Sequence, residues 1–394
     1  MLLHGPACPE SHEEGATASF AVKVYDYQWA TTFGMNAEQA AAELARDGID
    51  TVLIRNAIDP LPNSGVDQLS YLAAAGGTPL PSDRAWSDAL KGAGMQVLQT
   101  TALFFDPDLV DSFPDARPID ATGTPSAGFD WYLGVCPTHE GYLDTKIARL
   151  VRVVEELEPN GLFLSFTRFP GFWENWIPDY AFTLADQFCF CDRCRTRFAA
   201  ERGIALPASD LPAQAAVILR DHAGAWGAWR AGVIREAIAR IKGAVSVGRT
   251  GVPVMLNTLP FPPSDYAGLE VRRTIAAQDL AVLSDVVDRF ELMTYLQILR
   301  RPDSWLKLAV AEARAAAPQR QLLCTLQVAP LYTEGVHAGR GRAAHITAEE
   351  MGATARAALA AGADGLVFYH WTDLLEDEAQ GGRKRDVLRE VTGA

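Results

Sequence analysis

The sequence predicts a closed (β/α)8 barrel, an α/β fold of eight parallel strands that alternate with helices. From residue 20 onward, short apolar runs alternate with longer Ala-rich amphipathic runs, and the alternation repeats about eight times. The short runs are apolar throughout, as strands covered on both faces should be. An open doubly wound sheet is the alternative, but no Gly-x-Gly-x-x-Gly turn follows the first strand.

The expected strands are rich in β-branched and aromatic residues and follow one another along the chain. They lie at 20–27, 51–56, 96–104, 161–169, 252–259, 290–296, 321–329 and 365–371. Helical patterns, several of which end at Gly or Pro, occupy the intervals. The clearest patterns lie at 37–48, 82–94, 142–159, 304–318 and 348–365.

Three segments interrupt this rhythm, at 106–131, at about 170–215 and at 331–345. Each follows the C-terminal end of an expected strand, the end at which barrel enzymes build their active sites. We therefore expect residues 1–19 to be a disordered or extended segment and residues 20–394 to form one barrel domain. The insertion at about 170–215 carries a cysteine cluster.

Composition and charge exclude several classes of protein. A hydrophobic fraction of 48% with 21% charged residues is enough for a large core. The formal net charge of -14 disfavours nucleic acids and anionic membrane surfaces as partners, because both attract clustered Lys and Arg. No run reaches the ~18 apolar residues of a membrane span. We expect a cytoplasmic protein, and a homo-oligomer is compatible with the sequence.

Three of the six cysteines lie within six positions, at Cys189, Cys191 and Cys194. On a helix the first two would point in nearly opposite directions, so the segment is expected to form a turn. Cys191 and Cys194 have the C-x-x-C spacing of a metal knuckle. Cys136 precedes the helix that leads into the strand at 161–169, so it is expected at the same edge of the barrel and is the best fourth ligand. His139 is the reserve.

Four cysteine ligands predict a structural zinc ion, because a closed thiolate set leaves no position for a catalytic water. Two alternatives remain open. The cysteines could be free and buried, or they could form a thiol redox pair or an iron–sulfur site, in which C-x-x-C also occurs.

The segment at 134–170 together with FCFCDRCRTRF at 188–198 resembles the β-galactosidases of glycoside hydrolase family 42 and related glycosidase-like barrels. The resemblance implies that Cys136, Cys189, Cys191 and Cys194 ligate a structural zinc. It also implies a general acid/base Glu at the end of the fourth strand and a nucleophilic Glu at the end of the seventh.

The chain departs from that family at both catalytic positions. The fourth strand ends without the expected Asn-Glu, and the seventh ends at Gln327 without an acid. In related barrels an acid often stands at the position of Ser165. The family's mechanism therefore cannot be transferred directly.

Polar and aromatic residues lie at the ends of the expected strands, where their burial would be costly without a partner or a ligand. The candidates for substrate binding are Lys23, Tyr25, Arg55, Arg168, Trp173, Asn257, Tyr295, Gln327, His370 and Trp371. Lys23 is ambiguous, since an internal salt bridge to Asp26 or Glu291 is an equally good interpretation.

Three acids are the catalytic candidates. Glu174 stands between two tryptophans in GFWENW, a composition that suits a sugar site and that would raise the pKa of a carboxyl group. Asp26 and Asp373 follow the first and last strands and could serve as base or nucleophile, although either could simply cap a helix or loop.

Two functions follow from these candidates. The first is a carbohydrate-active hydrolase that acts on a saccharide at the C-terminal face of the barrel. The alternative is a diverged barrel that binds a saccharide without hydrolysing it, which the missing acids favour. A thiol or iron–sulfur redox protein is the third hypothesis.

Overall fold

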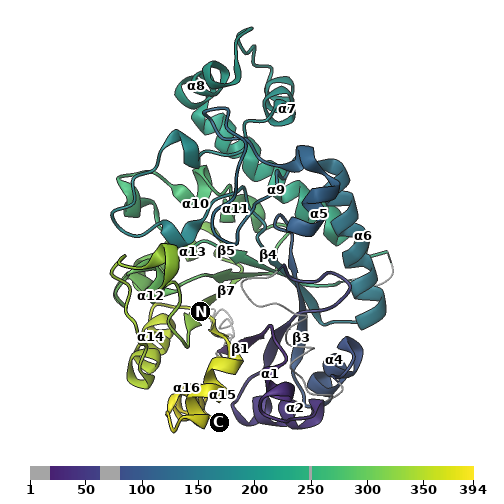
Figure 1. Cartoon of the computed structure of the whole chain (residues 1–394), viewed down its shortest axis with the longest axis vertical. Helices are drawn as coiled ribbons and strands as arrows, with labels where there is room; N and C mark the ends of the chain where they lie inside the picture. The colour runs from purple at the N-terminus through teal and green to yellow at the C-terminus, as the bar shows by residue number, and fades with distance from the viewer. Residues whose placement is uncertain (1–17, 63–79, 248–250) are drawn as a thin grey trace, which may run out of the picture.

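The computed structural model describes residues 18–62, 80–247 and 251–394, and its elements are shown in Figure 1. Most of the segment expected to be disordered or extended, residues 1–17, lies outside the described residues. Ser19 already belongs to the first strand.

Eight parallel strands close into a barrel in sequence order, and β1 pairs with β8. The strands are β1 Ser19–Val24, β2 Thr51–Ile54, β3 Gln96–Ala102, β4 Gly161–Ser165, β5 Val254–Thr258, β6 Arg289–Leu292, β7 Gln321–Gln327 and β8 Gly365–Tyr369. The predicted (β/α)8 fold is confirmed, and closure excludes the open sheet.

Helices surround this barrel and connect its strands (Figure 1). They are α1 Gln28–Thr31, α2 Ala37–Arg46, α4 Asp83–Gly92, α5 Pro107–Ser112, α6 Glu140–Leu157, α7 Asp192–Arg202, α8 Leu211–Asp221, α9 Ala223–Val245, α10 Val271–Thr274, α11 Leu280–Leu283, α12 Leu296–Leu299, α13 Trp305–Ala316, α14 Ala348–Ala360, α15 Trp371–Ala379 and α16 Lys384–Thr392. Among the described residues, no helix is both long enough and apolar enough to cross a membrane.

All eight strands lie where they were expected, but each ends one to four residues earlier than its apolar run. The remaining apolar and aromatic residues of these runs turn away from the sheet and contribute to the C-terminal face of the barrel. Hydrophobicity predicts burial, and at this end burial comes from loops that cover the barrel as well as from the sheet.

The lower interior of the barrel is apolar. Its side chains include Ala21, Leu53, Phe163, Met255 and Val367, all at most 1% exposed. Because strand residues two positions apart point to the same side, Lys23 follows Ala21 into the interior one layer nearer the C-terminal face. The barrel therefore becomes polar toward the end where the three long loops gather.

The insertion between β4 and α9 carries α7 and α8, which project from one end of the molecule in Figure 1. Its base is tied to the barrel by Arg230 of α9, which is fully buried. The Arg230 guanidinium donates to the carbonyl oxygens of Phe188 (2.6 Å) and Thr274, one in the insertion and one in the loop between β5 and β6. This link positions the insertion beside the C-terminal face.

Candidate functional site

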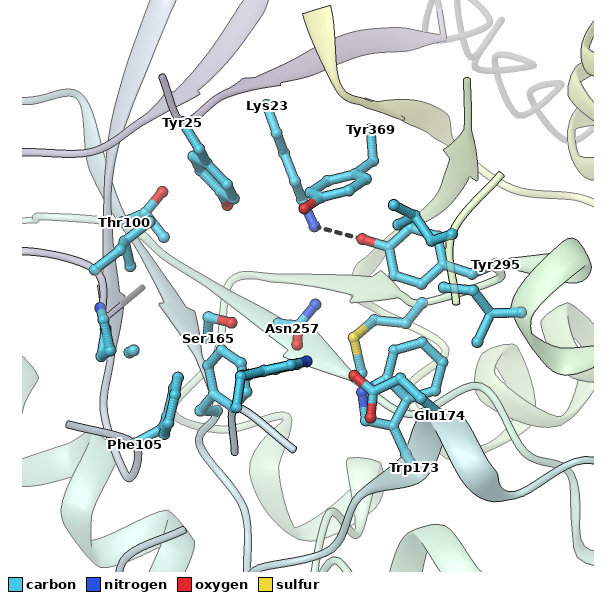
Figure 2. Close-up of a pocket in the computed structure, with 18 of the residues that line it drawn as sticks. Lys23, Tyr25, Thr100, Phe105, Ser165, Trp173, Glu174, Asn257, Tyr295 and Tyr369 are labelled. Atoms are coloured by element: carbon cyan, nitrogen blue, oxygen red, sulfur yellow. Dashed lines mark hydrogen bonds between the residues drawn. The ribbon is translucent and has the colours of Figure 1, made fainter. Parts of the chain in front are cut away.

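A pocket opens at the C-terminal ends of the strands (Figure 2). Its volume of about 110 Å³ exceeds several-fold the ~10–15 Å³ that one water molecule needs. Eight aromatic side chains line it: Tyr25, Phe105, Trp131, Phe166, Trp173, Tyr295, Tyr332 and Tyr369. The other polar side chains of its described lining are Lys23, Thr100, Ser165, Arg168, Glu174 and Asn257. Such a site offers aromatic faces together with a few polar groups, as small-molecule sites generally do.

The turn after β4 places two of these side chains. Phe166 has a positive φ of 50°, which reverses the chain directly after Ser165, and the Arg168 amide donates to the Phe166 carbonyl oxygen at 3.0 Å. A left-handed conformation is costly for a residue with a bulky side chain, so the surrounding structure must hold Phe166 in it. Here it allows both Phe166 and Arg168 to line the pocket.

Glu174 lies in a short 3-10 turn, Trp173–Asn175, within the insertion. The guanidinium of Arg342 donates to the carbonyl oxygens of Glu174, Ile298 (2.9 Å) and Tyr332 (3.2 Å). One side chain thus joins three loops around the pocket and holds the backbone of Glu174 in place.

The Glu174 side chain is buried and points toward the space that the labelled residues of Figure 2 surround. Burial raises the pKa of Glu174 from 4.5 to about 7, although the positive charges of Arg168 and Arg342 lower it, and the charge of Asp130 adds to the rise. A carboxyl group with this pKa is protonated in half of the molecules at neutral pH, which suits a general acid.

Lys23 forms a buried ion pair with Glu291 of β6, with 2.6 Å between Nζ and Oε1. Its ammonium also donates to the hydroxyl of Tyr295 at 3.2 Å (Figure 2). Asn257 and Thr325 donate hydrogen bonds to the carboxylate of Glu291. Burial lowers the pKa of Lys23, while Glu291 opposes this change. Of the two partners considered from the sequence, the structure selects Glu291, and Lys23 of this pair lines the pocket.

The tyrosines of the pocket are hydrogen-bond donors. Burial is the main cause that raises the pKa values of Tyr25, Tyr295, Tyr332 and Tyr369 above the usual value of 10. At neutral pH their hydroxyl groups stay protonated, so they can donate to ligand oxygens but do not act as bases.

The four predicted cysteine ligands come together in space and are buried. Their sulfur atoms all lie within 4.8 Å of one another, with 3.8 Å between Cys136 and Cys191 and 3.4 Å between Cys136 and Cys194. Four sulfurs at the ~2.3 Å zinc–sulfur distance of a tetrahedral site would be about 3.8 Å apart. The group can therefore hold a metal ion. His139, the reserve ligand, instead accepts a hydrogen bond from the amide of Tyr142 as the cap of α6.

Seven predicted site residues line the pocket: Lys23, Tyr25, Arg168, Trp173, Glu174, Asn257 and Tyr295. The other six are absent from its described lining. Of the acids, Asp26 accepts hydrogen bonds from the Gln28 amide and from the hydroxyl of Thr372, and Asp373 forms a capping box with His370. Both acids thus make the capping contacts that were the alternative to catalysis.

The remaining three candidates form the structure behind the wall. Arg55 donates to the carbonyl oxygen of Tyr25 at 2.9 Å. Gln327 accepts a hydrogen bond from the amide of Ile298, and Trp371 is fully buried at the start of α15. Arg55 and Gln327 thus hold the pocket residues Tyr25 and Ile298 in place. The positions of Arg55, Gln327 and Trp371 do not support a direct contact with the substrate.

Several solved structures have a similar fold. The glycoside hydrolase domain of PgaB (BpsB) from Bordetella bronchiseptica matches with a TM-score of 0.62 and 16% identity over 94% of this chain and 99% of that one. The β-galactosidase of the Antarctic haloarchaeon Halorubrum lacusprofundi matches with a TM-score of 0.61 and 16% identity over 95% of this chain and 57% of that one. Gan42B, a GH42 β-galactosidase, matches with a TM-score of 0.60 and 11% identity over 96% of this chain and 57% of that one.

This chain shares the barrel fold of glycoside hydrolases. The predicted resemblance to GH42 β-galactosidases is thereby confirmed as a distant one, at the level of the fold. This chain spans about 57% of the length of these two β-galactosidases. No protein-family model matches the sequence, and a search of curated proteins finds no match.

Sequence reasoning missed several pocket residues. Trp131 and Tyr332 lie in two of the long loops that were expected near the active site, but nothing in their local pattern shows that they face inward. Asp130, which precedes Trp131, binds Nε2 of His337 at 3.1 Å and acts electrostatically on Glu174. The signal that could have identified Asp130 is an acid next to an aromatic residue in a loop expected at the active site.

Proposed function

We propose that this protein is a carbohydrate-active hydrolase that binds a saccharide in the aromatic pocket, with Glu174 as its general acid. The burial of Glu174 beside Trp173, with a pKa near 7, carries the proposal. Aromatic faces bind the apolar faces of pyranose rings, and the tyrosine hydroxyls can donate to sugar oxygens. The protonated Glu174 would donate its proton to the glycosidic oxygen as the bond to the leaving group breaks.

Hydrolysis needs a second carboxylate, which either attacks the anomeric carbon or activates a water molecule. Within the described lining of the pocket, Glu174 is the single carboxylate. Asp130 is the stronger candidate for the second role than Asp26 or Asp373, because its charge acts on Glu174. Its hydrogen bond with His337 would orient it.

The test is hydrolysis of nitrophenyl glycosides and of unactivated disaccharides between pH 5 and 9. Because the general acid must be protonated, we expect kcat/KM to fall as the pH rises above about 7. Glu174→Gln should lose about 10²–10⁴-fold in rate on disaccharides. Its loss should be smaller on nitrophenyl glycosides, since nitrophenolate leaves without a proton. Glu155→Gln, on the exposed face of α6, is the control and should be unchanged.

Stability provides an independent check on the protonation of Glu174. Folding raises its pKa from 4.5 to about 7, so the folded state favours the protonated form. The wild type should therefore lose stability relative to Glu174→Gln as the pH rises from about 5 to 8. Full activity of Glu174→Gln on disaccharides would contradict the proposal.

Because the described lining of the pocket holds a single carboxylate, a second candidate is a barrel that binds saccharides without hydrolysing them. Titration calorimetry with the same saccharides separates the two. Binding without turnover of any disaccharide or nitrophenyl glycoside would support the binding protein and exclude the hydrolase.

We also propose that the four-cysteine group binds a structural zinc ion. The sulfur spacing supports tetrahedral coordination, and the backbone amide of Ile119 donates to Sγ of Cys189 at 3.3 Å, as is usual for a metal thiolate. Arg193 and Arg230 lie close enough to be affected by the charges of these cysteines and would offset the negative charge of a zinc tetrathiolate. Thiolate ligands require reduced cysteines, so the zinc proposal is consistent with the predicted cytoplasmic location.

A further inference from the structure

Arg168 is a buried cation that forms no ion pair with any residue the structure describes. The residue is 2% exposed and lines the pocket. Its Nε, which is shielded from solvent, has no hydrogen-bond partner, and its guanidinium forms no ion pair within the described part of the chain. An unpaired buried charge costs free energy, so a folded protein retains one where a ligand supplies the partner.

The groups around Arg168 leave its hydrogen-bonding edge free. The guanidinium carbon lies 5.1 Å from the centre of the Phe166 ring and 5.9 Å from that of Tyr132. Aromatic rings interact with the charge of a guanidinium group but accept few of its five N–H donors. Glu174 is affected by the charge of Arg168 but does not form an ion pair with it. The fork of N–H groups is therefore available to a ligand.

The charges of the pocket indicate the charge of that ligand. Lys23 is neutralised by Glu291, with which it forms an ion pair at 2.6 Å. The opposite charges of Arg342 and Asp130, which also act on Glu174, offset each other. If Glu174 is protonated, as a general acid must be before it reacts, Arg168 leaves one net positive charge among these described residues. A monoanion balances that charge. A carboxylate also matches the planar guanidinium fork, because its two oxygens can accept two parallel hydrogen bonds.

We propose that the pocket selects an acidic saccharide, one that carries a carboxylate such as a uronic acid, and that Arg168 binds this carboxylate. The inference rests on the proposed saccharide site and names its substrate class. An anionic ligand beside Glu174 would also disfavour ionisation of Glu174, so substrate binding itself would keep the general acid protonated.

The test is calorimetric titration of the full chain with methyl glucuronoside and methyl galacturonoside, with methyl glucoside and methyl galactoside as neutral counterparts. We expect the uronides to bind at least about 10-fold more tightly, because their carboxylate accepts charge-assisted hydrogen bonds from Arg168. Arg168→Met should abolish the difference, and Arg168→Lys should retain part of it. Arg152→Met, on the exposed face of α6, should behave as the wild type.

Thermal unfolding distinguishes ligand binding from a structural role of Arg168. Without ligand, Arg168→Met should melt about 1–3 °C higher than the wild type, because it removes an unpaired buried charge. A lower melting temperature would indicate a structural role and would overturn the inference.

Three binding outcomes would also overturn it. If neutral glycosides bind as tightly as uronides, the pocket does not select acids, but the proposed saccharide function stands. If methyl glucoside 6-phosphate or 6-sulfate binds more tightly than the uronides, the ligand is not a carboxylate. If no saccharide of any class binds, the proposed function fails together with this inference.

Discussion

Replacing Cys191 with serine should release the bound metal and destabilise the insertion after β4. Cys191 precedes the first residue of α7, and Cys194 lies in the first turn of that helix, so the metal would join α7 to the segment that carries Cys136. Structural zinc is bound with about 10–16 kcal/mol in small domains. We therefore expect the free energy of unfolding of Cys191→Ser to be at least ~3 kcal/mol lower than that of the wild type. The measured zinc content should fall from about one ion per chain to near zero.

The matched control is Cys324→Ser. Cys324 is buried in β7, distant in sequence from the four ligands and outside the metal-binding group. This variant can lose stability, but it should keep its metal. Limited proteolysis should cut Cys191→Ser within the insertion and leave the barrel intact. Unchanged metal content and an unchanged melting temperature in Cys191→Ser would refute the zinc assignment, and visible absorbance would indicate an iron–sulfur cluster instead.

Replacing Lys23 with methionine should have the second large effect. The change leaves the Glu291 carboxylate fully buried, with the hydrogen bonds from Asn257 and Thr325 but without its counter-charge. Removal of one partner from a buried ion pair costs about 3–5 kcal/mol. Urea unfolding at pH 7 should show a loss of this size in the free energy of unfolding.

The double variant Lys23→Met/Glu291→Gln tests the cause. Glutamine is neutral, its carbonyl oxygen can accept the hydrogen bond of Asn257, and its NH2 group can donate to the hydroxyl oxygen of Thr325. The double variant should therefore recover most of the lost stability. A double-mutant cycle measures the coupling between the two positions. If the double variant is as unstable as the sum of the single variants, the loss comes from packing and the ion pair is not its source.

The barrel could be predicted because its pattern is repeated. Each run such as 51–56 or 365–371 is apolar on both faces, as in a parallel strand covered by helices. Eight such runs that alternate with helices are compatible with few folds other than a barrel. The ends of the strands could not be predicted. Residues such as Tyr25 and Phe166 are as hydrophobic as the strands they follow, but they lie in the loops that cover the C-terminal face. Hydrophobicity alone does not separate a strand from a buried loop.

The candidate site was predictable in part. Glu174 and Trp173 were identified because an acid between tryptophans in an insertion after β4 is an unusual composition, and the structure brings both into the pocket. Asp26 and Asp373 were equally plausible from their positions, since both follow a strand end. Their capping contacts depend on partners such as Thr372, which is 346 residues from Asp26 in sequence, so local pattern could not reveal them.

By itself, the sequence determined the parallel barrel and the four cysteines that meet at one point. The barrel and three of the cysteines follow from short-range rules, because strand periodicity decides which side a residue faces and the spacing of Cys189, Cys191 and Cys194 limits how the chain can turn. Cys136 was identified from the order of the barrel elements and from the family resemblance. The tertiary structure decided the partners of the charges. It paired Lys23 with Glu291, buried Glu174, and gave Arg168 no ion-pair partner among the described residues. Those outcomes depend on the paths of loops far apart in the chain, and burial makes the energies of these charges depend on their neighbours.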